Sequence, residues 1–311
     1  MWPLRIDWKA LKFCVEIEFV GGLPEGLELL PGWTLSLDER QLDEDGTESG
    51  GELRTPPITW KEREQIRTML SRLRERGARS NWGCGLHVHV DLQPWGAEII
   101  FPLAKTALFS QEALRDLLQT SEHRLLYCPP VTERMLERYR KNPDRAAFHR
   151  PGRPQSHRCG INVAAWFDIG TVEIRYANGS LDYGEVMRAT ECCLRFVAAV
   201  GAGARLPDSP LELASAIGAP LSGYPPAKLA PQWYRERIWL EDLLIPVIEP
   251  LVQKRVPGGD IHHVTPAPKG LKVAAETPDG NMTVFTIRPT QTGWEFSEDD
   301  SGGGTPMRDG G

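Results

Sequence analysis

The chain reads Val15-Glu16-Ile17-Glu18-Phe19 near its N-terminus, and this stretch decides the fold because apolar and charged side chains alternate along it. A period of two places successive side chains on opposite faces of a β-strand. The same pattern returns in Leu86-His87-Val88-His89-Val90 and in Val172-Glu173-Ile174-Arg175-Tyr176. We therefore expect three strands, each with aliphatic side chains packed on one face and ionisable side chains on the other.

The ionisable face poses an energetic problem. Burying even an uncharged polar group without a partner costs about 2–7 kcal/mol, and burying a lone charge costs more. A metal ion or a charged ligand would offset this cost. The three strands therefore predict a wet, charged and concave sheet face.

Composition limits the class of protein. A length of 311 residues allows one large domain or two small ones. The net charge of −6 argues against a nucleic-acid-binding surface, and glutamates interrupt the arginine-rich segment 63–79. The chain has no apolar run of the roughly 20 residues that a bilayer requires, and no evident signal peptide. We expect a cytoplasmic protein that binds neither nucleic acid nor membrane.

The six cysteines are irregularly spaced, and most of them lie in apolar stretches. This placement is typical of reduced, mostly buried thiols rather than of disulfides or a zinc site.

Strands and helices are expected in a mixed order along the chain. The expected strands are 12–20, 33–37, 84–92 and a hairpin of 158–167 with 171–177. The expected helices are 59–76, 98–108, 111–126, 132–141, 182–200, 211–217 and 232–254, with a loop at 142–155. Because the two types neither alternate strictly nor segregate, we expect an α+β fold around an antiparallel sheet.

The composition changes near residue 257, where proline and glycine become frequent. We expect one domain over 1–256 that carries the charged strands. A small β-rich extension should follow over 257–296, with short strands at 272–274, 283–288 and 292–296. The pair His262-His263 is interpreted as a loop feature. Residues 297–311 have almost no apolar side chain and are expected to be disordered.

A further carboxylate belongs with the charged strands. Glu52 follows Gly50-Gly51, which lets the backbone turn tightly. Carboxylates from several strands with one imidazole suit Mg²⁺ or Mn²⁺ bound to a nucleotide, because these cations prefer oxygen ligands. Zinc would more often show further histidine or cysteine ligands.

Four segments taken together resemble a known family. They are the Glu16-x-Glu18 strand, Gly-Gly-Glu52-Leu-Arg-Thr-Pro-Pro, Cys-Gly-Leu-His87-Val-His89 and Thr-Val-Glu173-Ile-Arg175. In this order they resemble the amidoligase family, whose members are carboxylate–amine ligases of the glutamine synthetase and glutamate–cysteine ligase fold. The resemblance covers roughly residues 12–200 and rests on the series, since each motif alone is weak.

The resemblance implies a curved antiparallel sheet with helices on one side, and a ligase that uses ATP and Mg²⁺ or Mn²⁺. It implies that Glu16 and Glu18 bind metal. Glu52 matches the second member of a later glutamate pair, whose first member is Asp45 or Glu48.

The resemblance also implies roles on the later strands. His87 matches a metal ligand, and His89 would lie nearer the substrates and the nucleotide. Glu173 matches a residue that binds metal beside the nucleotide, and Arg175 matches one that binds phosphate. Arg158 is the best match for an arginine that holds the phosphate or the substrate carboxylate, with Asn162 as a further polar contact.

The implied reaction activates a carboxylate as an acyl phosphate, which an amine then attacks. The substrates would be small-molecule or peptide carboxylates and amines, and His89 or a loop carboxylate could accept the ammonium proton. Two alternatives stay open. One is a metal-dependent hydrolase that activates water, against which Arg175 argues weakly. The other is a non-catalytic domain that binds nucleotide or peptide.

Overall fold

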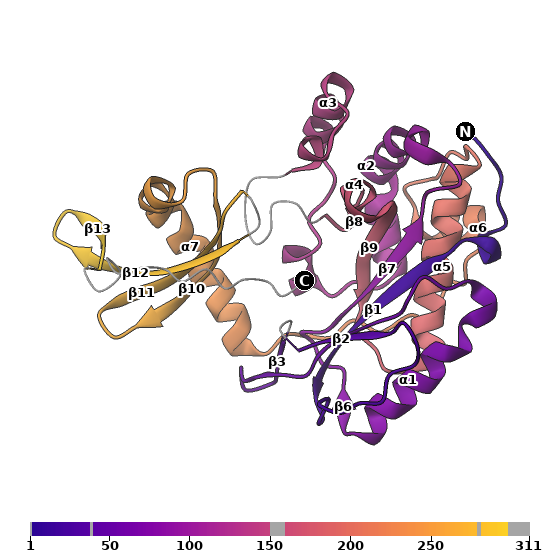
Figure 1. The fold of residues 1–311 in the computed structure, drawn as a ribbon. Coiled ribbons are helices and arrows are strands. Elements are labelled where there is room, and N and C mark those ends of the chain that lie inside the picture. Colours follow the sequence, from indigo (N-terminus) through magenta and orange to yellow (C-terminus); the bar gives the residue numbers. More distant parts are fainter. Residues whose placement is uncertain (1, 38–39, 150–158, 279–280, 298–311) are drawn as a thin grey trace. The chain divides into compact units, whose positions relative to one another are not determined.

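A computed structural model describes residues 2–37, 40–149, 159–278 and 281–297 (Figure 1). The described residues form two compact units, one that ends at Ala230 and one that begins at Pro231. Each unit is described by itself below. The expected tail over 297–311 lies outside the described residues except for Ser297.

The first unit is built on an antiparallel sheet with the strand order β2-β5-β1-β7-β9-β8, and β6 also pairs with β1. Its strands are β1 (Phe13–Gly21), β2 (Thr34–Ser36), β5 (Gly51–Arg54), β6 (Ala78–Arg79), β7 (Gly85–Asp91), β8 (Ile161–Asn162) and β9 (Thr171–Asn178). Two further short strands, β3 (Gln41–Leu42) and β4 (Glu48–Ser49), pair with each other. The expected α+β fold around an antiparallel sheet is confirmed.

The first unit also carries most of the helices. These are α1 (Glu64–Glu75), α2 (Ile100–Leu117), α3 (Glu133–Lys141), α4 (Ala165–Ile169), α5 (Tyr183–Gly201) and α6 (Pro210–Ile217). Short 3₁₀ turns lie at η1 (Trp8–Ala10), η2 (Trp60–Glu62), η3 (Gly96–Ile99), η4 (Glu122–Leu126) and η5 (Arg145–Phe148).

Local sequence explains where several helices begin and end. The Glu62 carboxylate accepts a hydrogen bond from the Thr59 backbone N–H, and the Asp182 carboxylate caps α5 at the N–H of Glu185. Gly77 follows α1 with a φ of +85°, which glycine adopts without a steric penalty.

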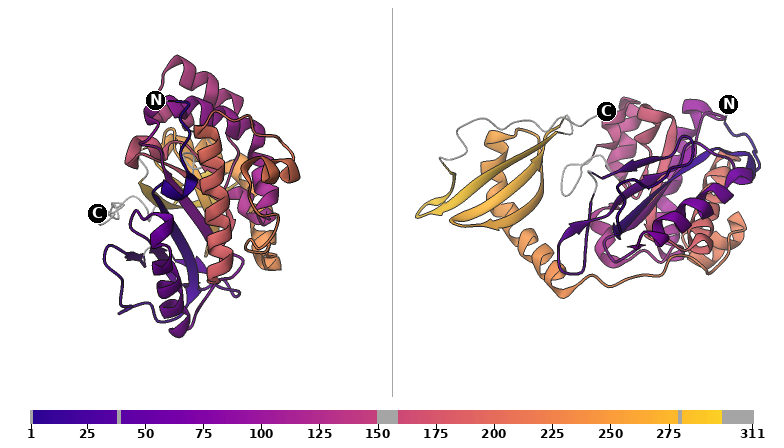
Figure 2. Two further views of the ribbon diagram at one scale, coloured as in Figure 1. Left: turned by 90° about the vertical axis from the view of Figure 1, so that its right-hand side faces the viewer. Right: turned by 60° about the horizontal axis from the view of Figure 1, so that its bottom comes forward.

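The apolar face of the sheet forms the core. Val15, Ile17 and Phe19 of β1 are fully buried, as are the aliphatic residues of β7. Helices α1, α2 and α5 contribute buried side chains to the same core and cover this face of the sheet, as Figures 1 and 2 show. The ionisable side chains of the same strands therefore project from the other face.

Two predictions about the elements of this unit were wrong in detail. Of the strand expected over 158–167, the described residues from 159 do not form one long strand, since β8 holds only Ile161–Asn162 and the helical turn α4 occupies Ala165–Ile169. Gly170 closes that turn in the left-handed region. The expected break near residue 110 is also absent, because α2 continues through Ser110, whose hydroxyl donates to the backbone oxygen of Leu206.

The second unit is a helix on a four-stranded antiparallel sheet. It contains α7 (Gln232–Arg255), β10 (Asp260–Ala267), β11 (Gly270–Glu276), β12 (Met282–Thr290) and β13 (Gly293–Phe296), with the strands in chain order. Ile248 and Val252 of α7 share a buried cluster with Val273, Phe285 and Ile287.

This buried cluster makes α7 part of the second unit rather than of the first. The expected domain boundary followed residue 256, whereas the two units divide after Ala230, because α7 buries its apolar side chains on the β10–β13 sheet. His262-His263 lies in strand β10 rather than in a loop.

Two expectations from composition can be compared with the structure. All six cysteines are free thiols, and five of them are buried, as expected. Among the described residues, we find no helix with the length and apolar character needed to cross a membrane.

The central position of β1 makes its core residues sensitive to truncation. We expect Ile17→Ala to lower the free energy of unfolding of the first unit by about 2–5 kcal/mol, because the side chain is fully buried and its loss leaves a cavity. Urea unfolding measures the change in the free energy of unfolding. Leu23→Ala, at a side chain that is 72% exposed, is the control and should change little. Equal effects of the two substitutions would contradict this account of the core.

Candidate active site

The strand register assembles the charged face around β1. Glu16 lies opposite His87 of β7 on one side and opposite Arg54 of β5 on the other. Glu18 lies opposite Glu52 of β5. Neighbouring strands in a sheet lie about 5 Å apart, so these side chains are within reach of one another. Three segments that are distant in the sequence, β1, β5 and β7, thus meet on one face.

The register extends the face through β9 to β8. His89 lies opposite Glu173, and Glu173 lies opposite Asn162. The pairing of β7 with β9 shifts between Leu86 and Val88, which marks an irregularity beside Arg175. The result is a continuous row of polar side chains across the middle of the sheet.

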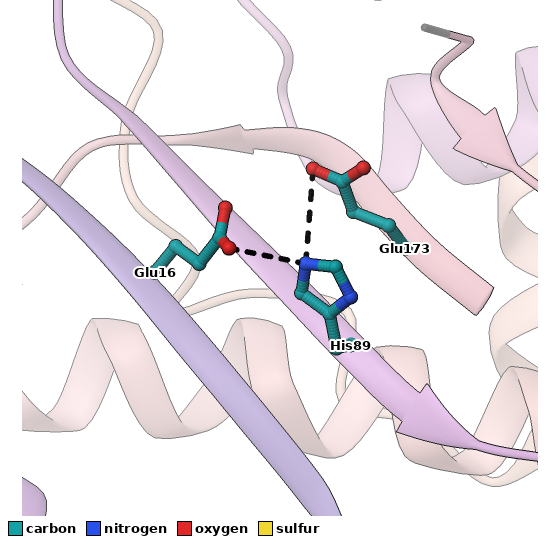
Figure 3. Close-up of side chains that lie close together, drawn as sticks. All are labelled: Glu16, His89 and Glu173. Carbon is teal, nitrogen blue, oxygen red and sulfur yellow. Dashed lines mark ion pairs between the residues drawn. The ribbon is translucent and has the colours of Figure 1, made fainter. Parts of the chain in front are cut away.

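The first group that could hold a cation consists of Glu16, His89 and Glu173 (Figure 3). His89 Nε2 lies 3.3 Å from Glu16 Oε1 and 3.9 Å from Glu173 Oε1. Its other ring nitrogen, Nδ1, is 3.1 Å from Thr171 Oγ1. The buried Nε2 atom has no hydrogen-bond partner among the described residues. The ring is thus held at one nitrogen while the other faces two carboxylates, as in metal-binding histidines.

The second group shares Glu16 and adds Glu52 and His87. His87 Nδ1 lies 3.1 Å from Glu16 Oε2. Glu52 is only 1% exposed and pairs with the Arg54 guanidinium. Arg54 Nε also lies 3.4 Å from Glu16 Oε1. Glu16 therefore belongs to both groups, with one oxygen toward each histidine.

Glu18 lies beside these groups and belongs to neither. Its Oε2 accepts a hydrogen bond from the Gly85 N–H and lies 4.0 Å from Arg124 Nη1. Its Oε1 is 3.6 Å from His87 Nε2. The structure thus places Glu18 where it orients His87 and balances a buried arginine.

Glu173 and Arg175 form a buried ion pair on β9. Asn162 donates its side-chain N–H to Glu173 Oε2 at 2.9 Å, which gives Asn162 a polar contact within the site. Arg175 Nη1 lies 3.4 Å from His87 Nδ1. The guanidinium is therefore held in the same cluster as the imidazoles and carboxylates.

The electrostatics of the face follow from burial and from opposite charges. Burial opposes ionisation of Glu16, but the imidazoles of His87 and His89 outweigh it and hold the pKa of Glu16 far below its usual range. Burial also opposes ionisation of Glu173, and Arg175 with the two histidines lowers the pKa of Glu173 to about 2. Against the effect of burial, Glu16 and Glu173 raise the pKa of His89. Glu16 and Glu173 are therefore ionised near neutral pH.

Four residues named from the sequence need separate comment. Asp45 and Glu48 are exposed, belong to neither group, and Asp45 instead accepts a hydrogen bond from the Thr47 N–H. Arg158 lies outside the described residues. His89, expected nearer the substrates, lies within a group that could bind a cation.

Three further residues on this face were not expected from the sequence. Thr171 contacts His89, Arg54 contacts Glu16, and Arg124 Nη1 lies 4.0 Å from Glu18 Oε2. Arg54 stands in a quoted motif, two residues after Glu52, so strand periodicity could have found it. Arg124 lies in the η4 turn, and no sequence pattern links it to the site. Gly85 makes room for it, since an added Cβ there would lie 2.8 Å from Arg124 Cζ.

The close contact between Gly85 and Arg124 can be tested. We expect Gly85→Ala to cost about 1–3 kcal/mol of stability, because the new methyl group displaces the guanidinium from Glu18. The double variant Gly85→Ala/Arg124→Ala removes that clash, so its cost should fall short of the sum of the single variants. Urea unfolding of all four proteins measures the coupling. Strict additivity would show that the two residues do not interact.

The lowered pKa of Glu173 predicts a pH dependence of stability. Its folded pKa of about 2 lies below the ordinary value of 4.5, so the unfolded state binds more protons between these values. Ionised Glu173 therefore stabilises the fold above about pH 5, by about 3 kcal/mol, and this contribution is lost as the pH falls toward 2.

The pH dependence of stability can be measured by replacing the carboxyl group of Glu173. Glu173→Gln should be less stable than the wild type at pH 6, and the difference in unfolding free energy should narrow as the pH falls from 5 toward 2. Urea unfolding in the presence of a chelator measures both proteins. A constant difference over this range would contradict the pKa assignment.

Comparison with known protein families identifies the same part of the chain as the geometry of the site does. Residues 9–197 match the family described as "Putative amidoligase enzyme", and this span includes the four charged segments. A search of curated proteins found no match. Because the match covers more than half of the chain and all of the strands that carry the site, the protein belongs to the amidoligase family.

Proposed function

We propose that the protein is an ATP-dependent carboxylate–amine ligase that forms an amide or isopeptide bond. The observation that carries the proposal is the pair of ligand groups that share Glu16 on one sheet face of an amidoligase family member. We also propose that the first unit is the catalytic domain and has a fold of the glutamine synthetase kind.

The donor set fits Mg²⁺ or Mn²⁺. Glu16 contributes to both groups, Glu52 and Glu173 contribute one carboxylate each, and each group has one imidazole. Oxygen-rich sets of this kind suit hard divalent cations that also bind phosphate oxygens. A cation bound here would neutralise the phosphate oxygens of ATP during phosphoryl transfer.

The protein's own residues supply fixed charge for the same step. Arg175 is 5% exposed and is held by Glu173, so its guanidinium needs little reorganisation when a phosphate oxygen approaches. Asn162 and Thr171 fix the orientation of Glu173 and His89 by hydrogen bonds. The orientation of these side chains is thus fixed before a cation and a phosphate bind.

The proposed reaction has two steps. A substrate carboxylate oxygen attacks the γ-phosphorus of ATP, the bond to the β–γ bridging oxygen breaks, and ADP leaves. The amine nitrogen then attacks the acyl carbon, and the phosphate leaves with the electron pair of the C–O bond. The ammonium proton passes to a carboxylate of a neighbouring loop, or to His89 where its Nε2 does not ligate the cation.

Two alternatives remain as outcomes of experiment. A metal-dependent hydrolase would use the same carboxylates and imidazoles to activate water. A non-catalytic domain would bind nucleotide or peptide without turnover. The family membership and the buried Arg175 favour the ligase.

The first test is an activity assay. We expect release of ADP and phosphate from ATP with Mg²⁺ when a suitable pair of substrates is supplied, screened among amino acids, polyamines and peptides. Continued absence of ADP release, together with metal-dependent cleavage of an ester or amide, would replace the ligase proposal by the hydrolase.

The second test separates binding from turnover. ATP with Mg²⁺ should raise the melting temperature of the wild type, and Glu16→Gln or His87→Ala should abolish this shift with the fold intact by circular dichroism. Glu28→Gln, at a side chain that is 86% exposed, is the control and should keep the shift. If both site variants keep the shift, the cation assignments are wrong.

A further inference from the structure

Arg54 occupies a distinctive position among the arginines of the site. Its Nε lies 3.4 Å from Glu16 Oε1 and hydrogen bonds to Glu52 Oε1. These are two of the three members of the second group that could hold a cation. The guanidinium therefore lies where it balances the charge that a divalent cation would balance.

The other two arginines of the face are held differently. Arg175 and Arg124 are 5% and 3% exposed, and Arg124 donates to the Arg175 backbone oxygen at 3.1 Å. The side chain of Arg54 is 37% exposed and projects from the last residue of β5. Burial thus fixes two guanidinium groups, whereas the third is partly exposed to solvent.

Electrostatics makes Arg54 and a bound cation competitors. A divalent cation at Glu16 and Glu52 would lie within a few ångströms of the Arg54 guanidinium, where like charges repel strongly even at an effective dielectric constant near 20. Without a cation, the same guanidinium relieves the repulsion between the two carboxylates. Its withdrawal into solvent would remove the repulsion once a cation is bound.

We propose that Arg54 is an internal counter-ion of the Glu16–Glu52–His87 group, which competes with the divalent cation and lowers the affinity of the site for it. The inference rests on the proposed function for the identity of the cation and adds how the chain regulates its binding. It assigns Arg54 a role through charge rather than through contact with substrate.

The experiment measures Mn²⁺ binding by titration calorimetry on the full chain after treatment with a chelator. Arg54→Gln should bind Mn²⁺ about tenfold more tightly than the wild type, because the competing charge is gone. Arg54→Lys keeps the charge and should stay close to the wild type. Arg63→Gln is a matched control, since the Arg63 side chain is also 37% exposed but pairs with Glu64.

A second readout is thermal stability without nucleotide. Without metal, Arg54→Gln should melt below the wild type, because Glu16 and Glu52 lose their counter-ion. Saturating Mn²⁺ should restore the melting temperature, so the shift is larger in the variant than in the wild type.

The outcomes separate this inference from the proposed function. If the wild type binds Mn²⁺ and Arg54→Gln binds no more tightly, the counter-ion role is overturned while the cation site stands. If only Arg54→Gln binds, the competition is supported. If neither protein binds Mn²⁺, both the cation site and the inference fail.

Discussion

The contact between Glu16 and His87 is the interaction on which the rest of the charged face depends. It arises from the antiparallel register of β1 with β7, which sets Glu16 opposite His87. Because side chains alternate along a strand, a slip of one residue would turn Glu16 and Glu18 into the apolar core. The burial of Val15, Ile17 and Phe19 excludes that slip. The core thus holds the charged face in place.

The same face shows how a protein keeps many charges in a small volume. Glu16, Glu52 and Glu173 each lie near a cationic or potentially cationic partner, so none is buried alone. The low pKa of Glu173 and the raised pKa of His89 are consequences of this pairing. Such an arrangement resists acid and leaves the carboxylates ready for a ligand of opposite charge.

The second unit has its own core, and its described residues include none of the charged face. Its helix α7 packs on its own sheet, so the family match over residues 9–197 and the first unit are in agreement about where the site lies. Composition alone placed the change of domain later, at residue 257, where proline and glycine become frequent. The packing of α7 places it at Pro231.

Local patterning alone determined the charged strands of this protein. Alternation predicted β1, β7 and β9 and their polar residues, since the period of a strand is a property of consecutive residues. The cap residue Asp182 likewise predicted the beginning of α5, whereas the predicted cap Thr59 begins the η2 turn and α1 starts only at Glu64. The position of Glu52 after Gly50-Gly51 added a further carboxylate, and the family resemblance added its role and the order of the motifs.

Only the tertiary structure decided which residues meet. Arg124 enters the site from a turn distant in sequence, and His89 joins Glu16 and Glu173 because strand register places it opposite β9. Asp45 and Glu48, near Glu52 in sequence, belong to neither group that could hold a cation. Contacts between distant segments depend on strand order and packing, which no short stretch of sequence encodes.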